Sequence, residues 1–150
     1  MSPEAVYEYA KSIANAIKPI PLLLKVGLFK NLEQMKTVFK AAARAGVRGI
    51  CGINSVSMQI VDAEGRPALG EDRKIAGVCG GAIRPLALHF IREAKEIVAS
   101  EKLGLILLGC GGIMNSHHVD EFLQTGATAA LSATGMMWDP YLAARYKERP

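Results

Sequence analysis

Hydrophobic positions along the chain follow two periods, which predicts amphipathic helices separated by short buried strands. The expected helices begin after Ser2 and Asn31, at Arg84–Pro85, after Asn115 and at Asp139–Pro140, and the expected strands cover residues 22–26, 49–54, 105–108 and 127–133. Strands that are apolar throughout and alternate with amphipathic helices indicate an α/β protein with a parallel sheet. One helix followed by four strand–helix units fits either an open doubly wound sheet or half of a (β/α)8 TIM barrel, whose full length is about 250 residues.

Residues 55–75 interrupt this rhythm and predict a small hairpin or an ordered excursion. Elsewhere the spacing predicts which apolar side chains are buried. The stripe of the first helix is expected to comprise Val6, Tyr9, Ala10, Ile13 and Ile17. Met136, Met137 and Trp138 are expected to pack beneath the last helix.

Composition narrows the class of protein. The 150 residues are 50% hydrophobic and 21% charged, which suits one globular domain with a real core. The net charge of +4 comes without a basic block, so a nucleic-acid partner is not expected. No stretch approaches the about 20 apolar residues of a membrane span, and the first residues predict a capped helix and not a signal peptide. Three widely spaced cysteines favour reduced thiols and a cytoplasmic setting over a disulfide framework.

The most informative stretch is residues 105–116, where an apolar strand stops at Gly109, Gly111 and Gly112 and a helical pattern follows. Bare backbone N–H groups at a strand-to-helix turn can cradle an anion such as a phosphate. The alternative is a plain tight turn, which is common in α/β folds.

Five segments together resemble the dihydroorotate dehydrogenase family of FMN barrels, which includes the pyrimidine-reducing barrel of dihydropyrimidine dehydrogenase. They are residues 21–26 (PLLLKV), 53–57 (INSVS), 77–88 (GVCGGAIRPLAL), 109–113 (GCGGI) and 126–135, and they occur in the family's order and spacing. The resemblance implies that residues 1–150 form a partial FMN-binding domain, about strands five to eight of the barrel. It also implies an oxidoreductase acting on the CH–CH bond of a dihydropyrimidine such as dihydroorotate or dihydrouracil.

The resemblance also assigns roles to individual residues. Lys25 matches the strand lysine that faces the flavin, where a cation stabilises the anionic reduced ring. An unpaired lysine buried in an apolar strand would be costly, and the alternative is a strand-end lysine that reaches solvent. Asn54 and Ser55 match the pair that hydrogen-bonds a pyrimidine substrate, although a strand-end Asn can simply start a turn. The remaining expected FMN contacts are Gly80, Gly111, Gly112, Thr134 and Gly135.

The chain departs from the family pattern in two places. Its last expected strand ends Ala133-Thr134-Gly135, and Cys79 stands where serine or glycine is usual. The family's general base, on the loop before the lysine-bearing strand, has no counterpart in residues 1–18. We therefore expect no catalytic residue and no activity from this chain alone. The missing barrel half would lie in the same or another chain, or a homodimer would close the sheet, because two sheet edges are otherwise exposed.

Other readings remain open. Cys110 has no base beside it in sequence, so a small residue in a tight turn is favoured over a nucleophile. His117 and His118 are adjacent and face different directions on a helix, which favours a surface pair over a metal site. The rival functions are a non-catalytic binding or interaction subunit and a phosphate-binding isomerase or aldolase without flavin, in which Lys25 would form a Schiff base.

Overall fold

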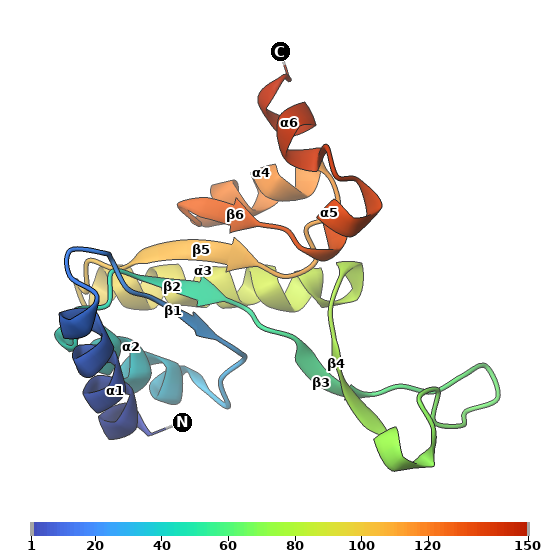
Figure 1. Cartoon of the computed structure of the whole chain (residues 1–150), viewed down its shortest axis with the longest axis horizontal. Coiled ribbons are helices and arrows are strands. Elements are labelled where there is room, and N and C mark those ends of the chain that lie inside the picture. The colour runs from blue at the N-terminus through green and yellow to red at the C-terminus, as the bar shows by residue number, and fades with distance from the viewer. Residues whose placement is uncertain (1, 150) are drawn as a thin grey trace.

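The computed structural model describes residues 2–149 and contains one four-stranded sheet, one hairpin and six α-helices (Figure 1). The helices are α1 (Pro3–Ala16), α2 (Leu32–Arg44), α3 (Arg84–Ser100), α4 (Ser116–Thr125), α5 (Thr134–Trp138) and α6 (Leu142–Lys147). The strands are β1 (Leu23–Val26), β2 (Gly49–Gly52), β3 (Val56–Gln59), β4 (Ile75–Val78), β5 (Ile106–Cys110) and β6 (Ala129–Leu131), and the 3₁₀ turns are η1 (Glu71–Arg73) and η2 (Gly81–Ile83).

Helix starts follow the capping residues that the sequence contains. Asn31 accepts a hydrogen bond at its Oδ1 from the Gln34 N–H (2.8 Å), and Asn115 accepts one from the His118 N–H (3.0 Å). Ser2 does the same for the Ala5 N–H at 3.5 Å. Each bond satisfies a donor that the helix itself leaves without a partner.

The main sheet is parallel, with the strand order β1-β2-β5-β6. Together with the following helices, its strands form four strand–helix units after α1, which confirms the predicted α/β architecture. Sequential neighbours pair directly, and the β3–β4 hairpin is inserted between β2 and α3. This is the arrangement of half a (β/α)8 barrel that has no partner strands at its two edges among the described residues.

One face of the sheet carries the core. Helices α3 and α4 pack on the strands, α2 lies beside α3, and α1 packs on α2. Gly52 and Gly109 are required here. A Cβ at Gly52 would overlap the ring of Phe90, and a Cβ at Gly109 would overlap the ring of Phe122, and both rings are buried. The strands therefore lie close to the helices, and the buried apolar side chains fill this layer.

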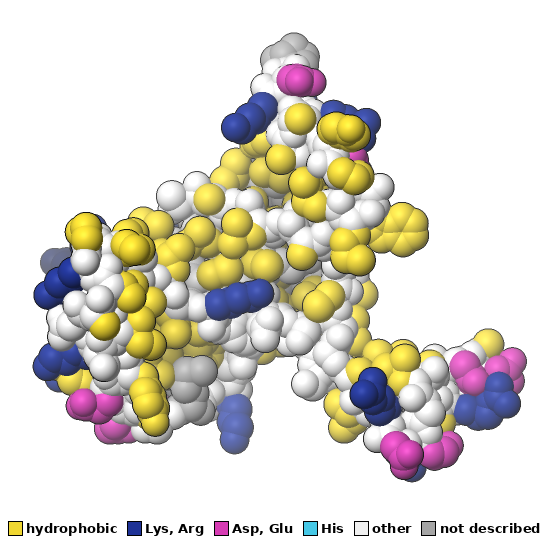
Figure 2. All heavy atoms as spheres, viewed as in Figure 1, with side chains coloured by type: hydrophobic (Ala, Val, Ile, Leu, Met, Phe, Trp, Pro, Cys, Tyr) yellow, Lys and Arg dark blue, Asp and Glu magenta, His cyan; other side chains and the backbone are white. Residues whose placement is uncertain are grey.

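The opposite face of the sheet is uncovered, as Figure 2 shows by the apolar side chains spread over it. Leu23, Ile106 and Leu131 come from three strands of this sheet and are 42–44% exposed. Side chains alternate along a strand, so the residues that do not face the helices must face this side. In a closed barrel the same face would line the interior.

The expected excursion is present as a long arm. Strands β3 and β4 pair antiparallel from Val56↔Val78 to Gln59↔Ile75, and a bridge between Val61 and Pro67 extends the arm beyond them. Figure 1 shows it projecting away from the sheet and helices. Residues 55–75 are thus ordered, and their main pairing partner is β4, which the sequence pattern did not identify.

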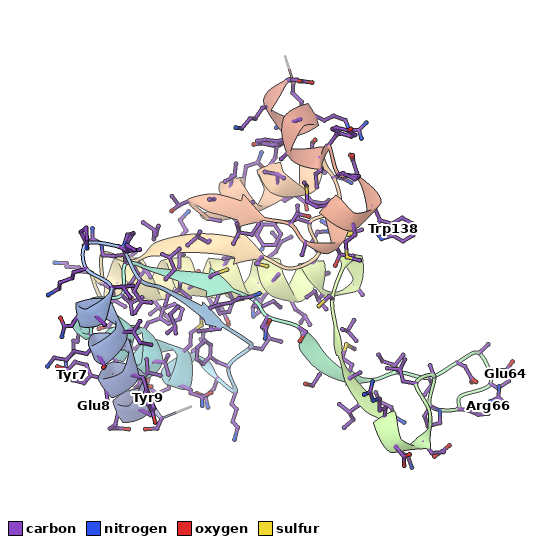
Figure 3. All side chains as sticks on the ribbon, viewed as in Figure 1. Tyr7, Glu8, Tyr9, Glu64, Arg66 and Trp138 are labelled. Atoms are coloured by element: carbon purple, nitrogen blue, oxygen red, sulfur yellow. The ribbon has the colours of Figure 1, made fainter. Side chains whose placement is uncertain are left out.

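Three sequence expectations were wrong. Of the stripe expected on α1, Val6 and Ala10 are buried, but Tyr9 and Ile13 are 73% and 47% exposed. Figure 3 shows Tyr9 on this helix. Trp138 is 80% exposed and does not pack beneath the last helix. The strand expected at residues 127–133 is only β6, and the last helix begins at Leu142, after the short α5. No described helix has the length and apolar character needed to cross a bilayer.

Candidate functional site

A small open pocket of about 90 Å³ lies at the carboxyl-terminal ends of the parallel strands. It is lined by Lys25, Ile53, Asn54, Ser55, Cys79, Gly80, Ile83, Cys110, Gly111, Gly112, Ile113, Leu131, Ser132, Ala133 and Thr134. All the predicted site residues except Gly135 are therefore gathered around one cavity. Parallel strands bring their carboxyl ends to the same edge, which is where barrels of this type place their sites.

Lys25 projects from the middle of β1 toward the uncovered face. It is exposed, and it forms no ion pair with any described residue. Of the two interpretations of this lysine, its exposure agrees with a side chain that reaches solvent, because the strand has helices on one face only. Its role toward a flavin stays a prediction. Register places Lys25 beside Cys51 of β2, so its ammonium group contributes positive charge to the inner part of the pocket.

Asn54 and Ser55 follow β2 directly. The Asn54 N–H donates to the Val26 carbonyl (2.9 Å), and the Ile53 N–H donates to the Cys110 carbonyl (2.5 Å). These bonds fix the strand end between β1 and β5. The Asn54 side chain is exposed, and the Ser55 side chain lies against Gly77 on the hairpin, where an added Cβ would approach the Ser55 Oγ to 2.6 Å.

The glycines of the pocket serve different purposes. Gly80 has φ +80°, and an added Cβ would stand 3.3 Å from the Thr134 methyl carbon, across the cavity. Gly112 has φ +77°, and its Cβ would overlap the backbone of Arg84 (2.8 Å to N and to Cα). The turn after β5 thus depends on glycine for its contact with α3, while its peptide groups still line the pocket.

Thr134 begins α5, which no side chain caps at its start within the described structure. Gly135 lies just outside the lining, and it has no room for a Cβ because the Ile113 carbonyl oxygen is next to it. Ser132 was missed in the sequence, although it is the first polar residue after β6. Its Oγ donates to the same Ile113 carbonyl (2.7 Å) and so joins the β5 and β6 loops.

Two cysteines lie on the neighbouring strands β2 and β5, and one of them, Cys110, lines the pocket. Cys51 is 6% exposed, whereas Cys110 is half-buried at the pocket wall. A hydrogen bond from the Cys51 thiol, assisted by the charge of Lys25, lowers the pKa of Cys110 to about 6 against the effect of burial. The same hydrogen bond, together with burial, raises the pKa of Cys51.

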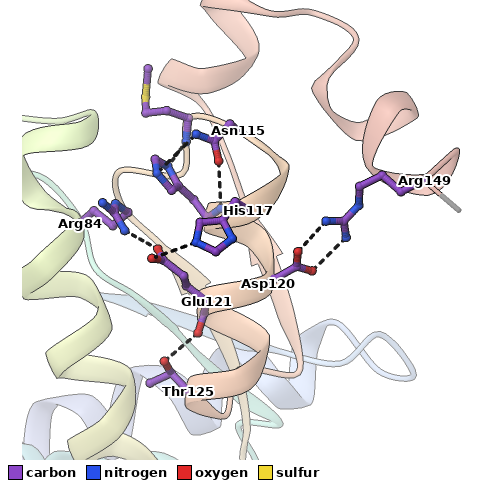
Figure 4. Close-up of polar contacts among 9 residues, drawn as sticks. Arg84, Asn115, His117, Asp120, Glu121, Thr125 and Arg149 are labelled. Carbon is purple, nitrogen blue, oxygen red and sulfur yellow. Dashed lines mark hydrogen bonds and ion pairs between the residues drawn. The ribbon is translucent and has the colours of Figure 1, made fainter.

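Polar contacts behind the pocket hold the β5 loop and α4 in place (Figure 4). Arg84, at the start of α3, forms an ion pair with Glu121 on α4, and His117 lies 3.7 Å from the same carboxylate. His118 accepts a hydrogen bond at Nδ1 from the Met114 N–H (3.1 Å). The two histidines are therefore a pair at a helix start, as expected, and no group of three or more metal-ligating side chains gathers among the described residues.

Comparison with known proteins gives a family for this architecture. Residues 2–148 match the model of the family described as dihydroorotate dehydrogenase. The chain belongs to the dihydroorotate dehydrogenase family. It is 46% identical to the dihydroorotate dehydrogenase of Dictyostelium discoideum over 148 residues, which cover 97% of this chain and 40% of that protein. It is 31% identical to the catalytic subunit of dihydroorotate dehydrogenase B (NAD(+)) of Shouchella clausii, over 93% of this chain and 43% of that protein.

A solved structure supports the fold. The crystal structure of dihydroorotate dehydrogenase from Eimeria tenella, in complex with ferulenol, superposes with a TM-score of 0.67 at 17% identity and covers 85% of this chain and 32% of that one. The α/β partial barrel of this chain is therefore a family fold. The chain spans about two fifths of the length of the curated relatives that it matches.

Proposed function

We propose that this chain forms the carboxyl-terminal half of an FMN-binding barrel, about strands five to eight, in an oxidoreductase acting on the CH–CH bond of a dihydropyrimidine such as dihydroorotate. The observation that carries the proposal is the pocket itself. Residues from four strand ends, far apart in sequence, converge on one cavity that holds a cation, an amide, a hydroxyl and bare backbone. This set suits a ligand with an anionic end and a polar ring.

The residues present fit FMN as a cofactor. The close approach of Gly80 to Thr134 leaves a cradle that a Cβ would fill, and the peptide groups of Gly111, Gly112 and Thr134 border it. We assign the phosphate to these loops, with Gly135 completing the turn. We assign the ring to the side of Lys25, whose ammonium group would stabilise negative charge on it. When bound, FMN supplies a hydride acceptor, which no side chain offers.

We assign the substrate to Asn54 and Ser55. An amide donates and accepts hydrogen bonds, so Asn54 can match the alternating N–H and C=O groups of a pyrimidine ring. Its exposure at the pocket mouth leaves both groups of the amide available. Ser55 would add one hydroxyl from the base of the hairpin arm. These two residues orient the ring, and neither is placed to remove a proton from carbon.

The proposed site is half of a catalytic centre. No general base is assigned among these residues, so we expect binding without turnover from the 150-residue chain. The uncovered sheet face supports a partner that completes the barrel, either the other half or a second copy. The same face is what favours the second candidate, a non-catalytic interaction subunit.

A titration of the purified chain with FMN, followed by its visible spectrum and by the mass in size-exclusion chromatography, tests the proposal. We expect a perturbed flavin spectrum, weaker binding in Lys25→Met, and unchanged binding in Lys18→Met, a lysine outside the pocket. Asn54→Ala should leave FMN binding intact and abolish any spectral effect of added orotate. If the chain binds no flavin, either alone or with the missing half added, the proposal is contradicted. The non-catalytic interaction subunit would then be the favoured function. Robust oxidation of dihydroorotate by the chain alone would contradict our expectation that these residues include no general base.

A further inference from the structure

A second hollow, of about 410 Å³, lies at the opposite end of the parallel strands from the candidate site. It is bordered by the end of α1, the connection from α1 to β1 and the end of α2. Leu22 precedes β1 and Arg48 precedes β2, and the Arg48 N–H donates to the Leu22 carbonyl (2.8 Å). The starts of both strands are therefore joined beside this hollow, which shares no lining residue with the proposed flavin and substrate pocket.

Every charged side chain that lines this hollow is cationic. The four are Lys11, Lys18, Arg44 and Arg48, and all of them are exposed. None of them forms an ion pair with a residue in the range 2–149. Helices α1 and α2 both end here, and each carboxyl-terminal helix end contributes only about half a negative charge. Four full positive charges outweigh these two ends, so we name this hollow the basic pocket.

Tyr7 holds two of these cations in place. The Lys11 Nζ donates to the Tyr7 hydroxyl (2.9 Å) and lies 5.0 Å from the centre of its ring. The guanidinium carbon of Arg44 lies 5.1 Å from the centre of the same ring. A cation is attracted to an aromatic ring without being neutralised by it. Tyr7 therefore positions two like charges near each other and leaves their charge available to a ligand.

The basic pocket lies on a different side of α1 from the apolar surface of that helix. Tyr9 and Ile13 form this apolar surface and are 73% and 47% exposed. With 3.6 residues per turn, Lys11 projects about 160° away from both of them. Figure 2 shows Lys and Arg side chains along the left edge of the molecule, beside α1. A chain segment that covers the apolar side of α1 therefore leaves the basic pocket open.

We propose that the basic pocket binds a small polyphosphate anion, such as inorganic pyrophosphate or the diphosphate group of a nucleotide. A guanidinium group donates paired hydrogen bonds to phosphate oxygens, and a lysine ammonium group adds a compact positive charge. Four cations around one hollow suit a ligand with several negative charges. The concave shape favours a small ligand over a flat membrane surface. The inference does not rest on the proposed flavin site, because the two pockets are separate.

Isothermal titration calorimetry of the 150-residue chain with inorganic pyrophosphate tests this inference. We expect saturable binding, which Arg44→Gln and Arg48→Gln should each weaken about tenfold or more, because each removes charged hydrogen-bond donors. Arg92→Gln is the matched control, since Arg92 is an exposed arginine of α3 outside the basic pocket, and it should leave the affinity unchanged. Absence of binding would overturn the inference. Equal weakening in all three variants would also overturn it, because only the net charge of the chain would then matter.

Nuclear magnetic resonance of the ¹⁵N-labelled, unmodified chain locates the anion even if a variant does not fold. Pyrophosphate should shift the amide signals of Ala45, Gly46 and Arg48, which border the basic pocket. Shifts confined to Gly111 and Gly112 would place the anion in the other pocket, which would overturn this inference and leave the proposed function standing. Binding to phosphatidylserine vesicles without binding of pyrophosphate would overturn it in favour of a membrane contact.

Discussion

Arg84 and Glu121 join the first residue of α3 to the middle of α4 through an ion pair, and both side chains are less than one third exposed. Arg84 also supplies the backbone against which Gly112 packs. The pair therefore holds the two helices that follow β4 and β5 on either side of the glycine turn. The ion pair and the packing of Gly112 together hold the turn after β5, which lines the pocket, between α3 and α4.

We expect Arg84→Gln to lower the free energy of unfolding by about 1 kcal/mol, because a partly buried ion pair is lost and Glu121 keeps its charge. Arg92→Gln, an exposed arginine on the same helix that has no ion-pair partner among the described residues, should change it by less than about 0.5 kcal/mol. Urea unfolding measures both. The double variant Arg84→Gln/Glu121→Gln should lose less free energy of unfolding than the sum of the losses in the two single variants. Strictly additive losses would mean that the two side chains do not interact.

Gly112→Ala should be more destabilising than its backbone conformation explains. Gly65 has nearly the same φ, +80° against +77°, but nothing lies within 4 Å of its added Cβ, whereas at Gly112 the Cβ would overlap Arg84. We expect about 1 kcal/mol for Gly65→Ala from the left-handed conformation alone. Gly112→Ala should cost about 1–3 kcal/mol more, from overpacking. Denaturant titration measures the free energy of unfolding of both variants. Equal losses would contradict the prediction, because they would show that α3 shifts to accommodate the Cβ at no energetic cost.

Glu101 makes stability depend on acid pH. Hydrogen bonds from Lys36 (2.5 Å) and Lys40 (2.8 Å) lower its pKa to about 2 from an ordinary value of 4.5. A carboxyl whose pKa is lowered by folding stabilises the folded state fully above its ordinary pKa, and the effect is lost as the pH falls through about 2. The difference in melting temperature between the unmodified chain and Glu101→Gln should therefore shrink from pH 5 to pH 2.

The matched control for this pH effect is Glu96→Gln, an exposed glutamate on α3 without an ion pair among residues 2–149. Its melting curve should follow that of the unmodified chain over the same pH range. A constant difference for Glu101→Gln at every pH would attribute its effect to packing and not to charge.

The uncovered sheet face should drive self-association of the isolated chain, because three large aliphatic side chains on it are more than 40% exposed. Ile106→Lys and Leu131→Lys should shift the chain toward monomer in size-exclusion chromatography with light scattering. Ile75→Lys, at a residue that is 68% exposed on the hairpin arm, is the control and should leave the mass unchanged. A monomer at all concentrations in the unmodified chain would contradict this prediction.

The order of the helices and strands could be predicted from the sequence, because hydrophobic period and helix capping are local. Asn31 and Asn115 cap the helices they were expected to cap, and the apolar runs became parallel strands. Seven of the eight residues expected to bind ligand line the pocket, because strand-end residues of a parallel sheet meet at one edge. Their roles toward FMN and substrate stay predictions.

Tertiary structure alone decided which faces are covered. Whether Tyr9 and Trp138 are buried depends on neighbours distant in sequence, and on that point the local pattern was wrong. The position of Cys51 opposite Leu108 likewise depends on β2 lying next to β5, although more than fifty residues separate the two strands in the sequence. Helical and strand periods specify which side of an element is apolar, but only the packed chain specifies what lies against it.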